Sequence, residues 1–225
     1  MSQHEPLRPI SASKLETLEE AVAAYQSQLT DSVQEWYLRA RGLDDQALAG
    51  ARLGAVIDPI PGHERYEGMI CIPYLLADGT PVSMKFRCSE EHKCKDHGHV
   101  KYLGLPHEPA RVFSVGSIEK AGDVLHVAEG EFDAIILNSV GLPAIGLPGA
   151  SNWKPSYRRL LAGFSRIWIW ADPDQAGGDM ASRLEQALPS ARRVRLDGGD
   201  VNETFMEKGA EGLLSLVESG KVVPA

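Results

Sequence analysis

The chain has 225 residues, 43% of them hydrophobic, which is enough to bury a core in one large domain or two small ones. Its formal net charge of −8 excludes a protein that coats DNA nonspecifically, because such binding needs a basic surface. A nucleic-acid enzyme with a local basic track or an acidic metal site remains compatible with this charge. The three cysteines, Cys71, Cys88 and Cys94, are typical of a reducing compartment rather than of a disulfide framework.

The termini and apolar runs give no sign of export or of a membrane anchor. The N-terminal stretch lacks the apolar block of a signal peptide, and the chain has no run of about 18 apolar residues. We therefore expect an intracellular protein without a membrane partner.

The first half of the chain predicts a small helical and β-hairpin subdomain. Residues 1–14 are polar and are expected to form a loose tail. Apolar residues recur at helical spacing through 15–57, which predicts short helices there. Residues 70–87 alternate as a hairpin with Asp78–Gly79 as its turn, and 100–106 predict a further short strand.

From Gly122 onward the pattern alternates between strands and helices. This alternation predicts a mostly parallel sheet flanked by helices, and hence an α/β fold whose N-terminal part is α+β. We expect two units, 15–121 and 122–225. Strands are predicted in 124–130, 143–149, 166–172 and 192–197, and helices in 132–141, 156–164, 176–188 and 202–220.

Acidic residues follow three of the predicted strands. Glu129 follows the first, Asp172 and Asp174 follow the third, and Asp200 follows the last. Parallel strands end at the same edge of a sheet, so these carboxylates should gather there. Grouped carboxylates repel one another unless a cation neutralises them, and Mg²⁺ prefers one or two carboxylates with waters and phosphates. The pattern predicts a metal site for phosphate chemistry.

A simpler interpretation is that such aspartates only cap the helices that follow. For Asp174 alone, capping and metal binding explain the sequence about equally well. For the four acids together, their common edge favours the metal site. Asp133 lies one helical turn after Glu129, where it either joins this edge or only favours the positive end of a helix.

Three segments, "VAEGEFDAI", "WADPDQAG" and "DGGDVNE", resemble the TOPRIM module in its order of acids. Upstream, "SVQEWYLRARGLDDQALAGARLG", "ICIPYLLADGTPVSMKFR" and "HVKYLGLP" resemble the RNA polymerase core of DnaG-type bacterial and phage primases. "GEFDA" and "DVNE" are especially similar to the phage T7-type branch. The resemblance covers about residues 28–218, and the ordered set of segments is far more specific than Asp-x-Asp alone.

The resemblance implies a TOPRIM-type sheet and a DNA primase. Such an enzyme is a nucleotidyltransferase that synthesises short RNA primers on single-stranded DNA from nucleoside triphosphates with Mg²⁺ or Mn²⁺. It also implies a phage-encoded replication protein that acts in the cytoplasm of a bacterial host. The chemistry agrees, because joining nucleotides needs an activated oxygen, a stabilised pyrophosphate and compensation of the charge on phosphorus.

The resemblance also implies roles for single residues. Glu129 would be a general base or a metal ligand, and Asp172 and Asp174 would bind the divalent metals with support from Asp133 and Asp200. Lys85, Arg87 and Lys101 would contact template or nucleotide phosphate, whereas without the resemblance they read as an ordinary solvated strand face. Trp153, in a loop after a predicted strand, either stacks on a base or packs locally.

The sequence departs from the family pattern in three places. No paired Cys-x-x-Cys motif of a template-reading zinc module is present, and no phosphate-loop motif of a helicase domain. With the chain ending at Ala225, we expect a separately encoded helicase as partner. The second acid of the last motif is replaced by Asn202, which weakens the prediction of a second metal position.

The polar segment 88–99 concentrates possible metal ligands. Two cysteines and two histidines are sufficient for tetrahedral Zn²⁺, although the spacings do not match an ordinary zinc finger. The alternative is a polar hairpin loop with chance cysteines. The candidate ligands are Cys88, His92, Cys94, His97 and His99.

Two other functional classes fit the acidic motifs. A TOPRIM metal-dependent nuclease would use the same acids, but it has no need of the upstream segment from "MKFR" to "KYL". A non-catalytic replisome adaptor would keep the fold, but a cluster of acids is costly to hold together without a use.

Overall fold

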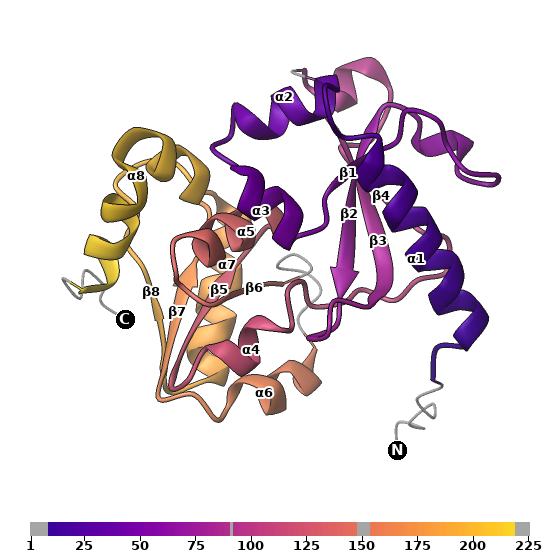
Figure 1. Ribbon diagram of the computed structural model, residues 1–225. Coiled ribbons are helices and arrows are strands. Elements are labelled where there is room, and N and C mark those ends of the chain that lie inside the picture. The colour runs from indigo at the N-terminus through magenta and orange to yellow at the C-terminus, as the bar shows by residue number, and fades with distance from the viewer. Residues whose placement is uncertain (1–8, 91, 148–153, 219–225) are drawn as a thin grey trace.

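The structure is a computed structural model that describes residues 9–90, 92–147 and 154–218. The described chain forms two four-stranded sheets, one antiparallel with the order β1-β2-β3-β4 and one parallel with the order β6-β5-β7-β8 (Figure 1). The predicted fold class is confirmed, since a helical and hairpin part precedes a parallel sheet flanked by helices.

The antiparallel sheet is built on the predicted hairpin. Strands β2 (Met69–Leu75) and β3 (Pro81–Cys88) pair along their length, and Gly79 in the turn between them has a φ of 86°. The short strands β1 (Gly54–Ala55) and β4 (Tyr102–Gly104) flank the hairpin. The helical prediction for 15–57 missed β1, which is too short to leave a periodic signal.

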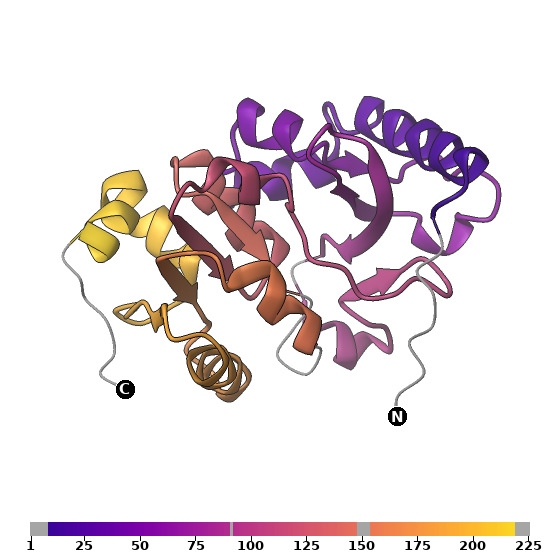
Figure 2. The same cartoon turned by 90° about the horizontal axis from the view of Figure 1, so that it is seen from below.

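Helix α1 (Ala12–Ser27) covers one face of this sheet (Figure 2). It begins at Ala12, two residues before the predicted end of the loose tail at residue 14, because the Ser11 side chain accepts a hydrogen bond from the backbone N–H of Lys14. Tyr25 and its helical neighbours pack on Met84 and Phe86 of β3. Lys85 and Arg87, which alternate with these two residues, therefore project from the opposite face.

Short elements connect the antiparallel sheet to the rest of the chain. Helices α2 (Val33–Arg39) and α3 (Asp45–Gly50) begin at the side-chain caps Ser32 and Asp44. The remaining short elements are the 3-10 turns η1 (Glu64–Tyr66) and η2 (Cys94–His97) and the helix α4 (Ser117–Lys120).

The parallel sheet follows the predicted alternation. Its strands are β5 (Val124–Ala128), β6 (Ala144–Gly146), β7 (Arg166–Trp170) and β8 (Ala191–Arg193). Its helices are α5 (Glu131–Ser139), α6 (Pro155–Leu161), α7 (Gln175–Ala187) and α8 (Val201–Glu218), the last with a kink at Gly209.

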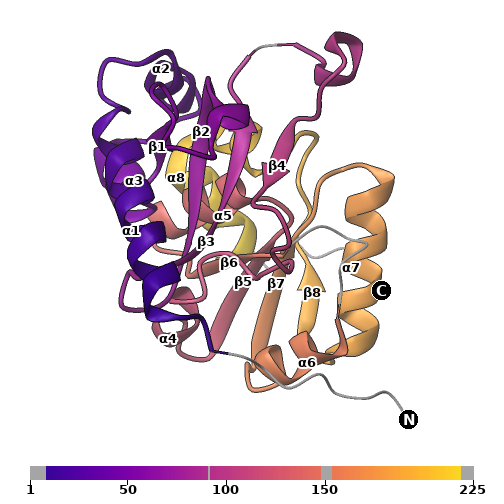
Figure 3. The same cartoon turned by 90° about the vertical axis from the view of Figure 1, so that its right-hand side faces the viewer.

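The two faces of the parallel sheet pack in different environments (Figure 3). Leu125, Val127 and Ile169 face α6 and α7 on one side. On the other side, Trp170 belongs to a core that also contains residues of α5, α8, α2, α3 and β2. This shared core joins the two sheets into one body and holds the carboxyl ends of the parallel strands near β3 and β4.

None of the helices in the described ranges is long and apolar enough to cross a membrane.

Candidate active site

Acidic side chains gather where β5 and β7 end. Glu129 comes directly after β5, and Asp172 lies two residues after β7, which is the strand beside β5 in the sheet. Asp133 lies in the first turn of α5, and Asp200 directly precedes α8. The acids of this edge are close enough to shift one another's pKa values, as their individual environments show.

Glu129 is half-buried, and one of its carboxylate oxygens has no hydrogen-bond partner among the described residues. Burial raises the pKa of its carboxyl group, and the charges of Asp172 and Asp174 raise it further. Its Oε2 atom is buried and has no hydrogen-bond partner within the described residues. A buried carboxylate oxygen without a donor is costly unless a cation or proton satisfies it. This atom is therefore free to accept a contact from a cation or a proton.

The ionised forms of Asp133 and Asp172 are also unfavourable in their surroundings. Burial and then Asp200 and Asp172 raise the pKa of Asp133 to about 7, whereas Arg87 opposes the shift. Burial raises the pKa of Asp172 as well, followed by the charges of Asp200 and Asp174, with Lys101 opposing. Mutual repulsion of this kind would be relieved by a divalent cation among the carboxylates.

Asp174 and Asp200 both cap helices. Asp174 Oδ1 accepts a hydrogen bond of 2.8 Å from the backbone N–H of Gly177, at the start of α7. Asp200 Oδ1 accepts one of 2.7 Å from the backbone N–H of Glu203, in the first turn of α8. The capping interpretation is thus correct for one oxygen of each carboxylate, and the roles of these residues toward metal stay predictions.

Gly177 is required where α7 approaches the acidic edge. A Cβ atom at this position would lie 2.3 Å from the backbone oxygen of Asp172 and 2.9 Å from Glu129 Oε2. Contacts this short do not occur with real side chains, so only glycine permits the approach. The first of the two glycines after Asp-x-Asp therefore has a packing reason.

Arg87 is buried and held by aromatic side chains. Its guanidinium donates hydrogen bonds of 2.8 Å to the hydroxyls of Tyr37 and Tyr102 and lies 4.5 Å from the ring centre of Phe132. Its Nε atom is buried without a partner in the described part of the chain. With Asp133 as a charge neighbour, Arg87 forms a fixed positive charge beside the acidic edge.

Lys85 pairs with an acid that the sequence did not single out. Its Nζ atom lies 2.6 Å from Glu131 Oε1, and the Tyr74 hydroxyl donates a hydrogen bond of 2.6 Å to the same oxygen. Glu131 is buried at the start of α5, so the two bonds tie the antiparallel sheet to this helix. The predicted contact of Lys85 and Arg87 with phosphate stays a prediction, since both are bonded within the protein.

Lys101 belongs to a group of cations that includes a residue missed from the sequence. Partial burial lowers the pKa of Lys101, followed by the charges of Arg87 and Arg41, whereas Asp172 opposes this shift. Lys101, Arg87 and Arg41 thus lie near one another and beside the acids. Like charges are held together favourably where an anion neutralises them, and phosphate is such an anion.

Asn202 explains how Arg41 is placed. The Asn202 side-chain amide donates a hydrogen bond of 2.6 Å to the Arg41 backbone carbonyl, and its oxygen accepts one of 3.4 Å from Arg41 Nη1. Arg41 also lies 4.4 Å from the ring centre of Tyr37. Asn202 is therefore buried against Arg41, and its amide makes a donor contact to the Arg41 carbonyl that an ionised carboxylate at this position could not make.

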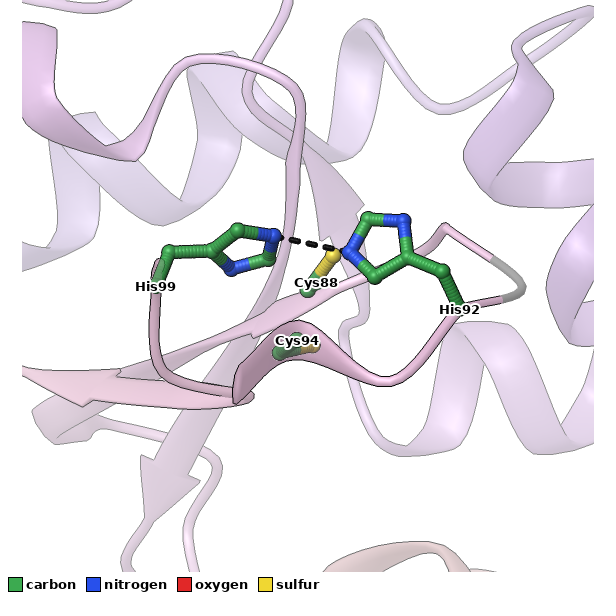
Figure 4. Close-up of side chains that lie close together, drawn as sticks. All are labelled: Cys88, His92, Cys94 and His99. Carbon is green, nitrogen blue, oxygen red and sulfur yellow. Dashed lines mark hydrogen bonds between the residues drawn. The ribbon is translucent and has the colours of Figure 1, made fainter. Parts of the chain in front are cut away.

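The structure brings together four of the five predicted Cys and His ligands. The ligand atoms of Cys88, His92, Cys94 and His99 lie within 4.8 Å of one another (Figure 4), a possible metal-binding cluster. His97 stacks on His92 with a distance of 4.1 Å between ring centres. Trp153, predicted to stack on a base, lies outside the described residues.

No protein-family model matches the chain. Among curated proteins, the gene 57 protein of Mycobacterium phage D29 is 31% identical over 153 residues, which are 68% of this chain and 99% of the phage protein. The chain belongs to the family of this phage protein.

Solved structures identify the fold. The zinc-binding and RNA polymerase domains of the Aquifex aeolicus primase superpose with a TM-score of 0.76 at 21% identity, covering 95% of this chain and 63% of theirs. The primase fragment of the bacteriophage T7 primase-helicase gives 0.61 at 23% identity, covering 80% of this chain and 72% of the fragment. This chain, a member of the phage protein family, therefore has the fold of the DnaG-type primase catalytic core.

Proposed function

We propose that the chain is the catalytic core of a DNA primase, which synthesises short RNA primers on single-stranded DNA from nucleoside triphosphates. The observation that carries the proposal is the placement of acids at the ends of β5 and β7 beside the cations Arg41, Arg87 and Lys101. Phosphodiester formation needs both kinds of charge at one place. The primase fold of the chain supports the same reaction class.

Mg²⁺ or Mn²⁺ fits the acidic edge. The buried Oε2 atom of Glu129 lacks a partner among the described residues, and the raised pKa values of Asp133 and Asp172 favour a cation nearby. Glu129, Asp133, Asp172, Asp174 and Asp200 would hold the ions. When bound, the metals would activate the attacking hydroxyl and offset the charge of the leaving pyrophosphate.

The protein's own groups divide the remaining tasks. Glu129 has a raised pKa, so its carboxylate is a better base for the proton of the attacking hydroxyl than an exposed glutamate. Lys101 directly precedes β4 and its side chain reaches solvent, so it is placed to bind a phosphate of the triphosphate or of the template. Arg41 and Arg87 are positioned by tyrosines, so their charges are fixed in advance of binding.

We assign residues 15–121 to a template- and nucleotide-binding subdomain and 122–225 to a TOPRIM domain; residues 12–14, predicted within the tail, belong to helix α1 and thus to the first of these units. The shared core makes the two a single working unit. Single-stranded DNA, nucleoside triphosphates and a separately encoded helicase are the proposed partners.

The test is incorporation of labelled ribonucleotides on single-stranded DNA with Mg²⁺ or Mn²⁺. The variant is Asp172→Asn/Asp174→Asn, because asparagine preserves the helix cap that alanine would remove. We expect short labelled RNA from the wild type and a loss of at least about 100-fold in the variant, since metal ligands act in the transition state. Asp179→Asn, an exposed acid on the same helix, should retain activity.

The other classes give different results in the same assay. Metal-dependent loss of labelled DNA without RNA synthesis would indicate a nuclease and contradict the proposal. Inactivity of the folded wild type, even with a helicase and a zinc module supplied, would indicate a replisome adaptor. A folded double variant as active as the wild type would exclude the acidic edge as the site of chemistry.

A further inference from the structure

Four soft ligand atoms converge in the connection between β3 and β4, outside the candidate active site. The sulfur atoms of Cys88 and Cys94 and a ring nitrogen each of His92 and His99 lie within 4.8 Å of one another. Tetrahedral Zn²⁺, with sulfur at about 2.3 Å and nitrogen at about 2.0 to 2.1 Å, requires ligand atoms roughly 3.3 to 3.8 Å apart. The Nε2 atoms of His92 and His99 lie 2.7 Å apart and would have to separate slightly, while the more distant ligand atoms would have to approach, so small shifts of the loop would produce this geometry.

The histidines are oriented as metal ligands are. His99 Nδ1 lies 3.2 Å from the backbone carbonyl of Val100, and a carbonyl only accepts hydrogen bonds. Nδ1 therefore carries the proton, which leaves a lone pair on Nε2. That Nε2 atom points at His92 Nε2, 2.7 Å away, beside the two thiols (Figure 4). A carbonyl bonded to the outer ring nitrogen is the usual support of a ligating histidine.

The cysteines are equally well placed. The backbone N–H of Glu90 donates to Cys88 Sγ at 3.4 Å, a contact that stabilises a thiolate. Cys94 is buried at the start of η2, and its carbonyl accepts a hydrogen bond of 3.1 Å from the backbone N–H of His99. Backbone hydrogen bonds thus hold Cys88 and Cys94 in place before any ion binds.

We propose that Cys88, His92, Cys94 and His99 bind one structural Zn²⁺ ion. Four protein ligands complete a tetrahedral shell, so no open position is left for a substrate or an activated water. His97 stacks against His92 and acts as a wall of the site rather than as a ligand.

The ion would fix the spacing of two cations of the candidate active site. Cys88 directly follows Arg87, and its backbone N–H donates a hydrogen bond of 3.0 Å to the carbonyl of Lys101. His99 lies two residues before Lys101 on the returning strand. Figure 3 shows this connection projecting beyond the strands, and residues 95–101 are all exposed, so without the ion little packing would hold it. Metal binding itself does not depend on the proposed polymerase activity.

The first test is the metal content of wild-type protein prepared without a histidine tag from zinc-supplemented cells. We expect about one equivalent of zinc per chain. Replacement by Co²⁺ should give the visible bands of tetrahedral coordination and the near-ultraviolet charge transfer of thiolate ligands. Less than about one tenth of an equivalent of zinc, together with no cobalt spectrum, would overturn the proposal without reference to any variant.

Variants test the four-residue set. Cys88→Ser and His99→Ala should lose at least about tenfold in zinc affinity, as removal of a ligand does. His97→Ala, in the same loop, and Cys71→Ala, a buried thiol elsewhere, should keep the full equivalent. Equal loss in His97→Ala and His99→Ala would refute this assignment of ligands.

Thermal unfolding gives a readout independent of activity. Chelation should lower the melting temperature of the wild type more than that of Cys88→Ser, because the variant binds the ion more weakly and loses less stabilisation with it. An equal effect of the chelator on both would overturn the site. A zinc-loaded chain without RNA synthesis would reject the proposed function and leave the zinc site intact.

Discussion

Asp174 and Asp200 each use a single oxygen to begin a helix at the acidic edge. Asp174 Oδ1 caps α7 and Asp200 Oδ1 caps α8. A carboxylate has two oxygens, so a cap and a metal contact are compatible on one side chain. At this scale the caps explain how the two residues are positioned, and their contact with metal stays a prediction.

Asp133 gives a prediction on pH. Its folded pKa of about 7 exceeds the ordinary value of 3.8, so between these pH values the folded state keeps a proton that the unfolded state has lost. Stability from this group therefore falls as pH rises from about 4 to 7 and stays low above 7. Asp133→Asn should be more stable than the wild type at pH 8 without metal, by on the order of 1 to 3 kcal/mol.

The check is urea unfolding of both proteins at pH 5 and pH 8 in the presence of a chelator. The difference between them should shrink at pH 5, and Mg²⁺ should stabilise the wild type more than the variant at pH 8. Equal pH dependence in the two proteins would show that Asp133 titrates normally.

At the scale of elements, the β7–α7 turn brings backbone and side-chain atoms into close contact at the acidic edge. The backbone of Asp172 and the carboxylate of Glu129 approach α7 at Gly177, where a Cβ would lie at 2.3 and 2.9 Å from them. The next residue, Gly178, is different, because a Cβ there would meet only Arg193 Nη1 at 3.8 Å. Two adjacent glycines of one helix thus have opposite tolerances.

Gly177→Ala should therefore destabilise the fold and displace Glu129 and Asp172. We expect a loss of about 1 to 3 kcal/mol, the usual cost of overpacking, and reduced RNA synthesis. Gly178→Ala is the matched control and should be neutral or stabilising by up to about 1 kcal/mol, since alanine favours helix. Chemical unfolding of both variants makes the comparison, and indistinguishable variants would contradict the close approach.

At the scale of the molecule, a shared core and a partly buried ion pair connect the two sheets. Residues of β2, α3, α5 and α8 share a hydrophobic cluster. Across the same seam, Lys85 of β3 lies 2.6 Å from Glu131 of α5, which also accepts from the Tyr74 hydroxyl. The shared core and the Lys85–Glu131 pair therefore hold Arg87 of the antiparallel sheet beside the acids at the ends of β5 and β7.

Lys85→Met should weaken the seam by leaving the buried Glu131 carboxylate without its cation. Lys85 is about one-third exposed (32%), so we expect about 1 to 3 kcal/mol rather than the full cost of breaking a buried pair. Adding Glu131→Gln should recover part of the loss, because the unpaired charge is removed. Lys120→Met, at an exposed lysine, is the control and should leave the free energy of unfolding in urea nearly unchanged. If the double variant Lys85→Met/Glu131→Gln is less stable in urea than Lys85→Met alone, the coupling is refuted.

The sequence by itself determined the alternation of elements and the order of the acids. The hairpin, the parallel strands and the helices follow from apolar periodicity, which is a local property of residues such as Ile167, Ile169 and Met180. The positions of Glu129, Asp172 and Asp174 follow from a rule of topology, because parallel strands end at one edge. Five candidate zinc ligands follow from composition within one short loop, and the fold brings four of them together.

Only the tertiary structure decided which charges meet. Arg41 and Glu131 have no periodic signal; they matter because Asn202 of α8 and Lys85 of β3 reach them across the fold. The aromatic enclosure of Arg87 and the space available at Gly177 likewise depend on elements far apart in the chain. Charge interactions and steric limits act through distance, and the folded core sets distances that spacing along the sequence does not.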